Sequence, residues 1–535
     1  MAIINQFDKR SGITYVYESF SYWDKDKQQP RSKRTLVGKI DKKTGKMIPT
    51  DGRGKKRHLT AENTTVGSAL VGKDTAKRLF FGATYLFDEI CDKLEITADL
   101  KHCFPTIYKQ ILSIAYYMIL EDSSPLFRFE KWDAIHKHPF GLNIPSQRSS
   151  EIFSSISEEG KNQFCSRQGK HHVEDEYWAY DTTSLSSYSE TLKQVTYGYN
   201  KENDRLPQIN LALVFGENSG LPFYYRKLAG NIPDVITLQK LLCDLSVLGF
   251  EKVKLVMDRG FYSEANINAL FKEHLKFIVS VSVSLSVVRK ELDKLFDSLP
   301  TYSYYSEQYE LYSGTVLADW SYTQVRRYKG DTVSEKRRIY IHLYYNIDRA
   351  TEERKNFDRK LIKYKEEVVH NRRVPEHESF YAKYFKIKET PKRGIQVEVK
   401  QDAVTKATRY YGYFALMSNE KMDSISALEL YRNKDVVEKA FGNLKERLNM
   451  RRMLVSSEKN LDGKLFVAFV ALIILSYIKT KMQQNQLFKS YTIQSMLDKL
   501  DVIECFETIG HDLQVGEVME KQKRLYEAMD IKPIS

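Results

Sequence analysis

Three acidic residues stand at positions from which their carboxylates could act together. Asp181 and Asp258 each end a predicted β-strand, in YWAYDTTS and VKLVMDRGFYS, and Glu438 lies on the predicted helix YRNKDVVEKAFGNLKERL. Divalent cations such as Mg²⁺ take oxygen ligands, and two of them can stabilise both the attacking and the leaving oxygen of a phosphodiester. The order strand Asp, strand Asp, helix Glu therefore predicts a site for two Mg²⁺ ions, which Mn²⁺ can replace, and phosphodiester cleavage as its chemistry.

The helix that carries Glu438 presents further side chains able to contact phosphate. Tyr431, Lys434, Glu438 and Lys445 follow one another at spacings of 3, 4 and 7 residues. At about 100° per residue they share one stripe of a regular, continuous helix. The apolar flank beside that stripe consists of Val437, Phe441, Leu444 and Leu448. We expect Glu438 to hold a metal while the two lysines and the tyrosine contact the phosphates of the strand being cut.

This spacing resembles the Tyr-x2-Arg-x3-Glu-x6-Lys signature of the DDE transposases of bacterial insertion sequences. The resemblance is to the insertion-sequence-4 superfamily and, within it, to the insertion-sequence-1634 subgroup. Lys434 stands where the signature has arginine, so the charge is kept and the planar bidentate fork is lost. Arg432 is a poor substitute, because it lies about 120° round a regular helix from Glu438.

The resemblance implies an activity and its partners. It implies metal-dependent hydrolysis at the ends of a mobile element, followed by strand transfer into target DNA, with Asp181, Asp258 and Glu438 as the catalytic and metal-binding residues. The partners would be double-stranded DNA, as terminal inverted repeats and target, and a second copy of the chain in a synaptic complex. A DNA hairpin as intermediate is likewise implied by the family.

The elements around the acids predict an α/β fold. Residues 166–287 read as five strands with a crossover helix, VITLQKLLCDLSVLGF, and a second helix, SEANINALFKEH. This is the strand and helix order of a ribonuclease H-like catalytic core, which residues 421–480 would complete. Residues 288–420 are rich in Tyr and β-branched residues and predict a β-rich insertion domain. Within it, Trp320 could stack on a flipped DNA base or could be a packed strand residue.

Two terminal regions flank this core. Residues 1–165 combine an opening β-like segment, the basic stretch GRGKKRH and several helices. The resemblance implies binding of the transposon end there, although no helix-turn-helix pattern marks a recognition helix. Residues 481–535 are charged and helical in pattern, and predict a C-terminal helical tail suited to protein contacts.

The composition favours a polyanionic partner, since the 535 residues carry a formal net charge of +13. Five cysteines without CxxC spacing indicate reduced thiols and a cytoplasmic setting. The resemblance implies that this is a bacterial cytoplasm, with the protein at the nucleoid. No signal-peptide pattern opens the chain. The apolar run from Leu465 to Ile478 is shorter than the roughly 20 residues of a membrane span. It predicts a buried helix that supports the Glu438 helix, and no membrane.

Alternatives remain at this point. Asp234, in GNIPD, is a further carboxylate near the predicted core, and we expect it to cap the helix that follows. A stand-alone nuclease with a ribonuclease H-like fold would use the same three acids but would have little use for the insertion. An inactive or domesticated DNA-binding relative would be expected to have lost an acid, whereas all three are present.

Overall fold

The computed structural model divides the chain into two units, Met1–Lys73 and Asp74–Ser535. It describes residues 2–8, 13–24, 29–40, 47–49, 77–121, 124–171, 176–189, 192–201, 205–250, 253–325, 332–390, 394–453, 455, 457–508 and 511–534. The basic stretch GRGKKRH, residues 52–58, lies outside the described residues.

The first unit is a four-stranded antiparallel sheet. Its strands follow in the order β1 (Ala2–Asp8), β2 (Ile13–Asp24), β3 (Gln29–Ile40) and β4 (Met47–Pro49). The sequence predicts a single N-terminal region over 1–165, but the structure divides it. The helices between residues 82 and 170 belong to the second unit, since their apolar residues are part of its large core.

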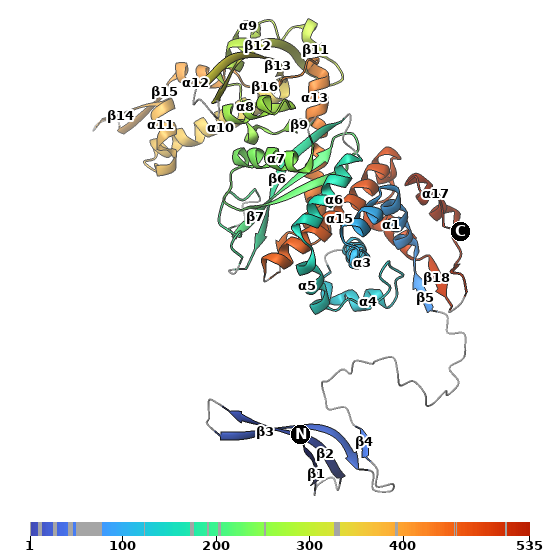
Figure 1. Ribbon diagram of the computed structural model, residues 1–535. Coiled ribbons are helices and arrows are strands. Elements are labelled where there is room, and N and C mark those ends of the chain that lie inside the picture. The colour runs from blue at the N-terminus through green and yellow to red at the C-terminus, as the bar shows by residue number, and fades with distance from the viewer. Residues whose placement is uncertain are drawn as a thin grey trace. The chain divides into compact units, whose positions relative to one another are not determined.

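The second unit is built on a ten-stranded mixed sheet (Figure 1). Its five predicted core strands are β6 (Tyr177–Ser187), β7 (Gln208–Gly216), β8 (Pro222–Ala229), β9 (Lys254–Met257) and β10 (Lys276–Val281). They lie in the order β8-β7-β6-β9-β10, with β6, β7 and β8 antiparallel and β6, β9 and β10 parallel. The two crossovers to the parallel strands contain α7 (Asp234–Leu248) and α8 (Glu264–Lys272). All five strands and both helices are predicted from the sequence.

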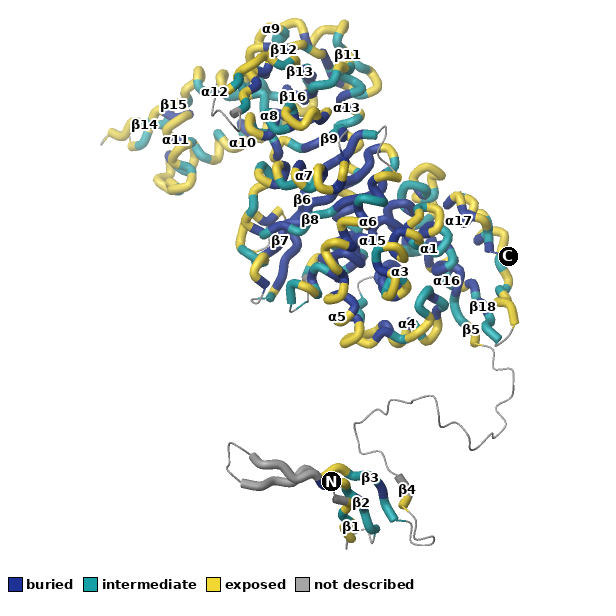
Figure 2. The backbone as a smooth tube through the Cα atoms, in the orientation of Figure 1, coloured by how far each residue is buried: buried dark blue, intermediate teal, exposed yellow. Residues whose placement is uncertain are grey.

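The core strands are buried because helices cover the sheet (Figure 2). All nine residues of β7 are buried, in keeping with its nearly continuous apolar sequence. In β6 ten of eleven residues are buried, and the exception is Asp181. Asp181 is therefore the one residue of β6 whose side chain is partly accessible to solvent.

The β-rich segment after β10 does not form a separate domain, contrary to the prediction for residues 288–420. The strands β11 (Tyr305–Ser306), β12 (Leu311–Val325), β13 (Thr332–Tyr345) and β16 (Tyr413–Ser418) extend the same sheet beyond β10. The pairing of β16 with both β10 and β13 joins the two parts of the sheet. The helix α9 (Ser286–Leu295) leads into this part of the sheet.

A smaller group of elements projects from the sheet between β13 and β16. It consists of α10 (Ile347–Val369), α11 (Glu378–Tyr384), β14 (Phe385–Thr390), β15 (Gly394–Val399) and α12 (Gln401–Thr408). It has an apolar cluster of its own around Phe357, Tyr381 and Tyr384. The part of the predicted insertion that stands out from the sheet is thus mainly helical (Figure 1).

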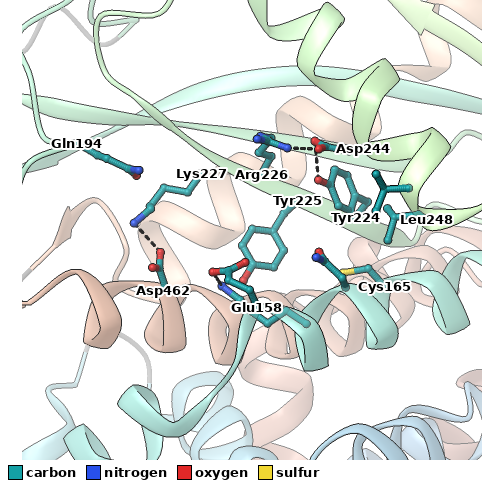
Figure 3. A pocket seen from close by; sticks show the side chains of 13 residues that line it. Glu158, Cys165, Gln194, Tyr224, Tyr225, Arg226, Lys227, Asp244, Leu248 and Asp462 are labelled. Carbon is teal, nitrogen blue, oxygen red and sulfur yellow. Dashed lines mark hydrogen bonds and ion pairs between the residues drawn. The ribbon is translucent and has the colours of Figure 1, made fainter.

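The opposite edge of the sheet, β8, borders a cavity of about 430 Å³ (Figure 3). Its charged side chains neutralise one another: Arg226 pairs with Asp244, and Lys227 pairs with Asp462 at 2.5 Å. None of the three predicted catalytic acids lines it. With its cations already paired, this cavity is a poor candidate for a polyanion.

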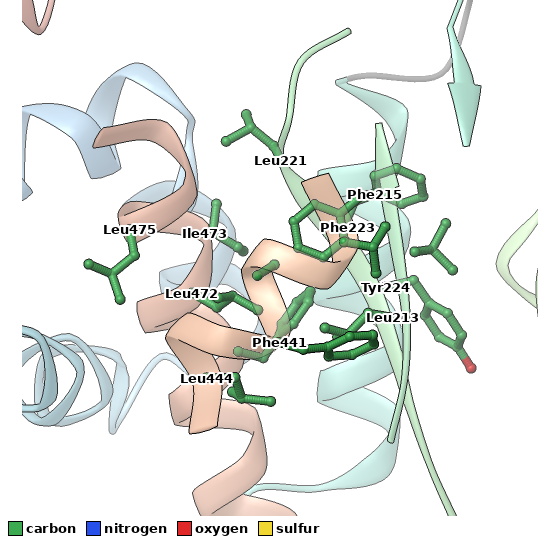
Figure 4. Close-up of a cluster of buried hydrophobic side chains, with 14 of the residues drawn as sticks. Leu213, Phe215, Leu221, Phe223, Tyr224, Phe441, Leu444, Leu472, Ile473 and Leu475 are labelled. Atoms are coloured by element: carbon green, nitrogen blue, oxygen red, sulfur yellow. The ribbon is translucent and has the colours of Figure 1, made fainter. Parts of the chain in front are cut away.

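The central support of the second unit is α15 (Glu458–Gln484), which packs on α3 (Tyr108–Leu120), α5 (Ser146–Ser155) and β8. Its Leu472 and Ile473 lie in the same apolar cluster as Phe441 and Leu444 from the Glu438 region (Figure 4). The predicted buried, supporting helix is confirmed. Among the described residues α15 is the one helix long and apolar enough to cross a membrane, and 89% of its apolar window is buried inside the protein.

The C-terminal segment packs on the second unit and is not a separate tail. It comprises α16 (Ile493–Asp501), β18 (Glu504–Glu507), β19 (Gln514–Val515) and α17 (Glu520–Ala528). β18 pairs with β5 (Lys77–Phe80), so the two ends of this unit meet in one small sheet. This unit also contains α1 (Gly82–Lys93), α2 (Ile96–Cys103), α4 (Phe129–Asp133), α6 (Glu158–Lys170) and β17 (Arg452–Met453).

Candidate active site

Asp181 and Asp258 lie next to each other on neighbouring parallel strands. In the register of β6 and β9, Tyr180 is opposite Met257, so Asp181 and Asp258 are the residues that directly follow this pair. β9 ends there because a 3-10 turn, Arg259–Phe261, begins directly after Asp258. The prediction that Asp181 ends its strand is wrong, because β6 continues past it to Ser187 and its later residues pair with β7. Parallel pairing thus brings both carboxylates to one place in the sheet, as the sequence predicts.

The Asp258 carboxylate is held in its ionised form by donors and cations. Tyr431 donates its phenolic hydrogen to Asp258 Oδ1 at 2.6 Å. Burial by itself would raise the pKa of Asp258. The hydrogen bond from Tyr431 and the positive charge of Lys434 outweigh burial, so the pKa lies below its ordinary value.

Asp181 is in a different electrostatic state. Its side chain is only 16% exposed, and this burial raises its pKa above the ordinary value. The Lys201 ammonium, with Nζ 3.6 Å from Asp181 Oδ1, and the backbone amide of Thr182, at 2.7 Å, act in the opposite direction. Two neighbouring carboxylates therefore have pKa values displaced in opposite directions, which is an arrangement found at functional sites.

The segment that carries Glu438 is not one regular helix, contrary to the sequence prediction. It consists of α13 (Ser424–Asn433), α14 (Asp435–Gly442) and a π-helical turn over Asn443–Arg447, with Lys434 outside both α-helices. The predicted stripe assumed 100° per residue throughout, and that assumption fails at Lys434 and again at the π-helical turn, where Lys445 lies. The apolar flank is confirmed, since Val437, Phe441, Leu444 and Leu448 are all buried.

Lys434 connects the three acids electrostatically. Its side chain is only 9% exposed, and its Nζ lies 3.1 Å from Glu438 Oε1. Burial would lower the pKa of Lys434, but the negative charges of Asp258, Glu438 and Asp181 raise it above the ordinary value. Glu438 itself is 58% exposed. The buried Lys434 ammonium therefore partly neutralises the negative charge of the three acids, and the Glu438 carboxylate contacts it from the solvent-exposed side.

The donor set suits Mg²⁺, because Asp181, Asp258 and Glu438 offer carboxylate oxygens, the ligands that this ion prefers. Within the described part of the chain, however, no group of three or more His, Cys, Asp or Glu side chains is positioned to hold a metal ion. The two aspartates are adjacent, while Glu438 is turned towards Lys434. Because Glu438 is exposed, a change in its side-chain torsion angles would cost little burial.

Residues 176–474, more than half of the chain, match the family described as the transposase DDE domain. The chain belongs to the DDE transposase family. No curated protein matches it. Among solved structures, this transposase is similar to the piggyBac transposase synaptic complex with hairpin DNA, at 11% identity over 74% of this chain and 69% of that chain. The TM-score of 0.35 is too low for that structure to inform the site.

The transposase has a second ionic group beside Asp181 that sequence reasoning does not identify. Lys201 pairs with Asp234, with 3.2 Å between Nζ and Oδ2, and donates to the carbonyl of Thr182 at 2.7 Å. Thr182 in turn donates its hydroxyl to Asp234 at 2.5 Å. Asp234 makes no side-chain cap; it is the first residue of α7, after Pro233 at the N-cap position. The prediction that Asp234 caps the helix is wrong, because its carboxylate pairs with Lys201 and accepts a hydrogen bond from Thr182 instead.

Lys201 carried no recognisable signal, since it follows a loop without periodicity and belongs to no motif. Its place in the structure depends on long-range contacts with Asp181 and Thr182, in the middle of β6. It nevertheless touches both Asp181 and Asp234, so it belongs to the candidate site of the transposase.

Trp320 is buried in the transposase. Its side chain on β12 is 6% exposed, and its indole N–H donates to Asn268 on α8 at 2.8 Å. A base cannot stack on a ring that is covered on both faces, so the structure favours the packed strand residue over the stacking platform. Arg326 and Arg327 lie outside the described residues.

Proposed function

We propose that this transposase moves an insertion sequence by cutting DNA at the element ends and joining the freed 3′ ends to target DNA. The observation that supports it best is the adjacency of Asp181 and Asp258 on parallel strands, with the Glu438 segment linked to them through Tyr431 and Lys434. The proposal includes membership of the insertion-sequence-4 superfamily and of its insertion-sequence-1634 subgroup.

The core in this proposal is ribonuclease H-like. In chain order the five core strands lie as 3-2-1-4-5, with the first three antiparallel and the last two parallel to the first. That order supports the assignment, because it brings the first strand and the fourth together: Asp181 lies within the first, and Asp258 directly follows the fourth.

Asp181, Asp258 and Glu438 would hold two Mg²⁺ ions. When bound, the metals would activate an attacking water and stabilise the leaving 3′ oxygen. Tyr431 keeps the Asp258 carboxylate oriented and ionised by its hydrogen bond. Lys201 and the Thr182 amide favour the ionised form of Asp181, but burial outweighs them and its pKa stays above the ordinary value.

The cations of this segment would change partners when DNA and metal arrive. Lys434 neutralises the acids in the structure described here, and the proposal has it contact the phosphate of the cut strand once the acids hold metal. Lys445, on the π-helical turn, would contact a neighbouring phosphate. Tyr431 would keep Asp258 as its partner and adjoin the same phosphate.

The partners in this proposal are double-stranded terminal repeats, double-stranded target and a second copy of the transposase. The region up to residue 165 would bind the repeat, with the four-stranded unit Met1–Lys73 as its separately folded part. Two DNA ends must be paired before transfer, which calls for two protomers.

The test is cleavage of an end-labelled duplex carrying the terminal repeat, in Mg²⁺ or Mn²⁺, by the wild type, Glu438→Gln and Asp435→Asn. Asp435 is an exposed acid on the same helix and serves as the matched control. We expect 3′-OH ends at the repeat boundary with the wild type and Asp435→Asn, and none with Glu438→Gln, which should still bind the repeat. Equal cleavage by Glu438→Gln would remove that residue from the site. Binding without cleavage by all three would favour an inactive DNA-binding relative.

A further inference from the structure

A basic cleft adjoins the candidate active site. It has a volume of about 750 Å³, and its lining includes six cationic side chains: Arg259, Arg289, Arg349, Lys406, Arg409 and Arg432. Glu353 is the only acidic residue among the described residues that line it. The cleft reaches the site through Tyr431, which lines it and also donates to Asp258.

Most of the positive charge in this cleft is not offset. Arg349 pairs with Glu353 at 3.0 Å, and Arg409 pairs with Asp293 at 3.1 Å. Within the described residues, no carboxylate lies at ion-pair distance from the other four cations. All six cationic residues are exposed. A cleft with this charge attracts phosphate, and the attraction weakens as salt rises.

Aromatic rings lie among these cations. The guanidinium groups of Arg289 and Arg409 stand over the Tyr410 ring, at 5.5 and 5.3 Å from its centroid, and Arg349 stands 5.2 Å from the centroid of Phe414. Both rings are partly exposed in the cleft lining. Cationic grooves that also present aromatic rings bind single-stranded nucleic acid, since the cations follow the phosphates and the rings stack on bases.

The walls of the cleft come from both parts of the extended sheet. Ser280, on β10, and Arg289, on α9, form one wall, and the projecting helices contribute Arg349 from α10 and Lys406 from α12. Figure 1 shows α12 and the start of α10 beside β16. Arg432 reaches the cleft from α13, whereas Lys434, two residues later, faces the acids. Because α13 ends at Asn433, Arg432 lines the cleft while Lys434 contacts the acids of the candidate active site.

We propose that this cleft binds the phosphates of a single DNA strand next to the bond that is cut. The inference rests on the proposed function, because the cleft is next to the cut bond only if Asp258, which the cleft adjoins through Tyr431, is part of the catalytic site. The rings of Tyr410 and Phe414 can stack only on bases that are not already paired and stacked in a double helix, so a duplex does not enter the cleft in a way that uses them. A strand separated from its complement does.

The experiment uses the full chain and the double variant Arg289→Gln, Lys406→Gln. Both residues are exposed and lie away from the acids, and neither has an ion pair to a described carboxylate, so the fold should persist. The control is Lys131→Gln, Arg524→Gln, which removes one exposed lysine and one exposed arginine on other surfaces. Fluorescence anisotropy measures binding of a labelled single-stranded oligonucleotide, and of its duplex, at low and moderate salt.

Each phosphate contact with a single strand adds about 0.7 to the slope of log affinity against log salt. Two contacts therefore make the wild type lose about sevenfold more affinity than the double variant between about 50 and 200 mM salt. We expect that difference for the single strand, wild-type behaviour for the control pair, and little change for the duplex.

An unchanged salt dependence in the double variant would overturn the proposal. So would an equal loss of affinity for single strand and duplex, because the cleft would then contact the outside of a double helix. Failure of the proposed function has a different signature: a wild type that binds single strands through these cations but does not cut the element ends. That result would leave the cleft as a strand-binding site and refute the catalysis.

Discussion

The hydrogen bond from Tyr431 to Asp258 makes the environment of the acids measurable in the protein without DNA or metal. Tyr431→Phe removes a donor that lies 2.6 Å from a partly buried carboxylate and leaves the ring in place. A hydrogen bond to a charged group contributes about 1.5–3 kcal/mol to stability. Because Asp258 keeps the nearby charge of Lys434, we expect the lower end, about 1.5 kcal/mol, at neutral pH.

The sign of the pH dependence follows from the lowered pKa of Asp258. Its contribution to the free energy of unfolding is complete well above 3.8, the ordinary pKa of the group, and is lost as the pH falls through the folded-state value. Removal of the Tyr431 donor moves the folded-state pKa upwards. The wild type and Tyr431→Phe should therefore differ most at neutral pH and converge in acid.

The assay is urea unfolding of both proteins at several pH values, followed by tryptophan fluorescence. Tyr309→Phe is the matched control, because Tyr309 also donates to a carboxylate, that of Glu429, but on the exposed surface. Its removal should change stability little at any pH. Equal stabilities of wild type and Tyr431→Phe at neutral pH, or a difference that stays constant into acid, would refute the reasoning.

Four further substitutions have definite expected outcomes. Lys201→Gln removes a cation next to Asp181, whose pKa burial already raises, so the acid limb of the pH profile for cleavage should move to higher pH; an unchanged profile would dismiss Lys201. Trp320→Phe should cost about 1 kcal/mol in unfolding free energy through its lost hydrogen bond and leave DNA affinity unchanged, as binding titrations would show. Gly463→Ala would place a Cβ 2.2 Å from the backbone of α5 and should lower the melting temperature sharply, whereas Gly442→Ala meets nothing within 4 Å and should be neutral or stabilising.

The features of the fold and site that could be predicted from sequence are those that depend on residues close together along the chain. The five core strands appear as apolar runs, and Asp181 and Asp258 directly follow two of those runs, although β6 itself continues to Ser187. Their parallel pairing follows from the crossover helices between them. The apolar flank of the Glu438 helix is also visible, because Val437 and Phe441 recur at helical spacing.

What could not be predicted depends on long-range contacts or on small distortions. The extension of the sheet by β12, β13 and β16 is decided by strand pairing across a long stretch of chain, and the same holds for β5 with β18. The break at Lys434 has no Gly or Pro to announce it. A buried lysine between acids looks in sequence like any solvated helix residue.

The central claim is that Asp181, Asp258 and Glu438 hold the same pair of metal ions. Electron paramagnetic resonance counts bound Mn²⁺ directly, in complexes of the transposase with terminal-repeat DNA. We predict two ions per protomer for the wild type and for Asp435→Asn, and the loss of at least one ion in each of Asp181→Asn, Asp258→Asn and Glu438→Gln. Two ions retained in Asp258→Asn would contradict the account.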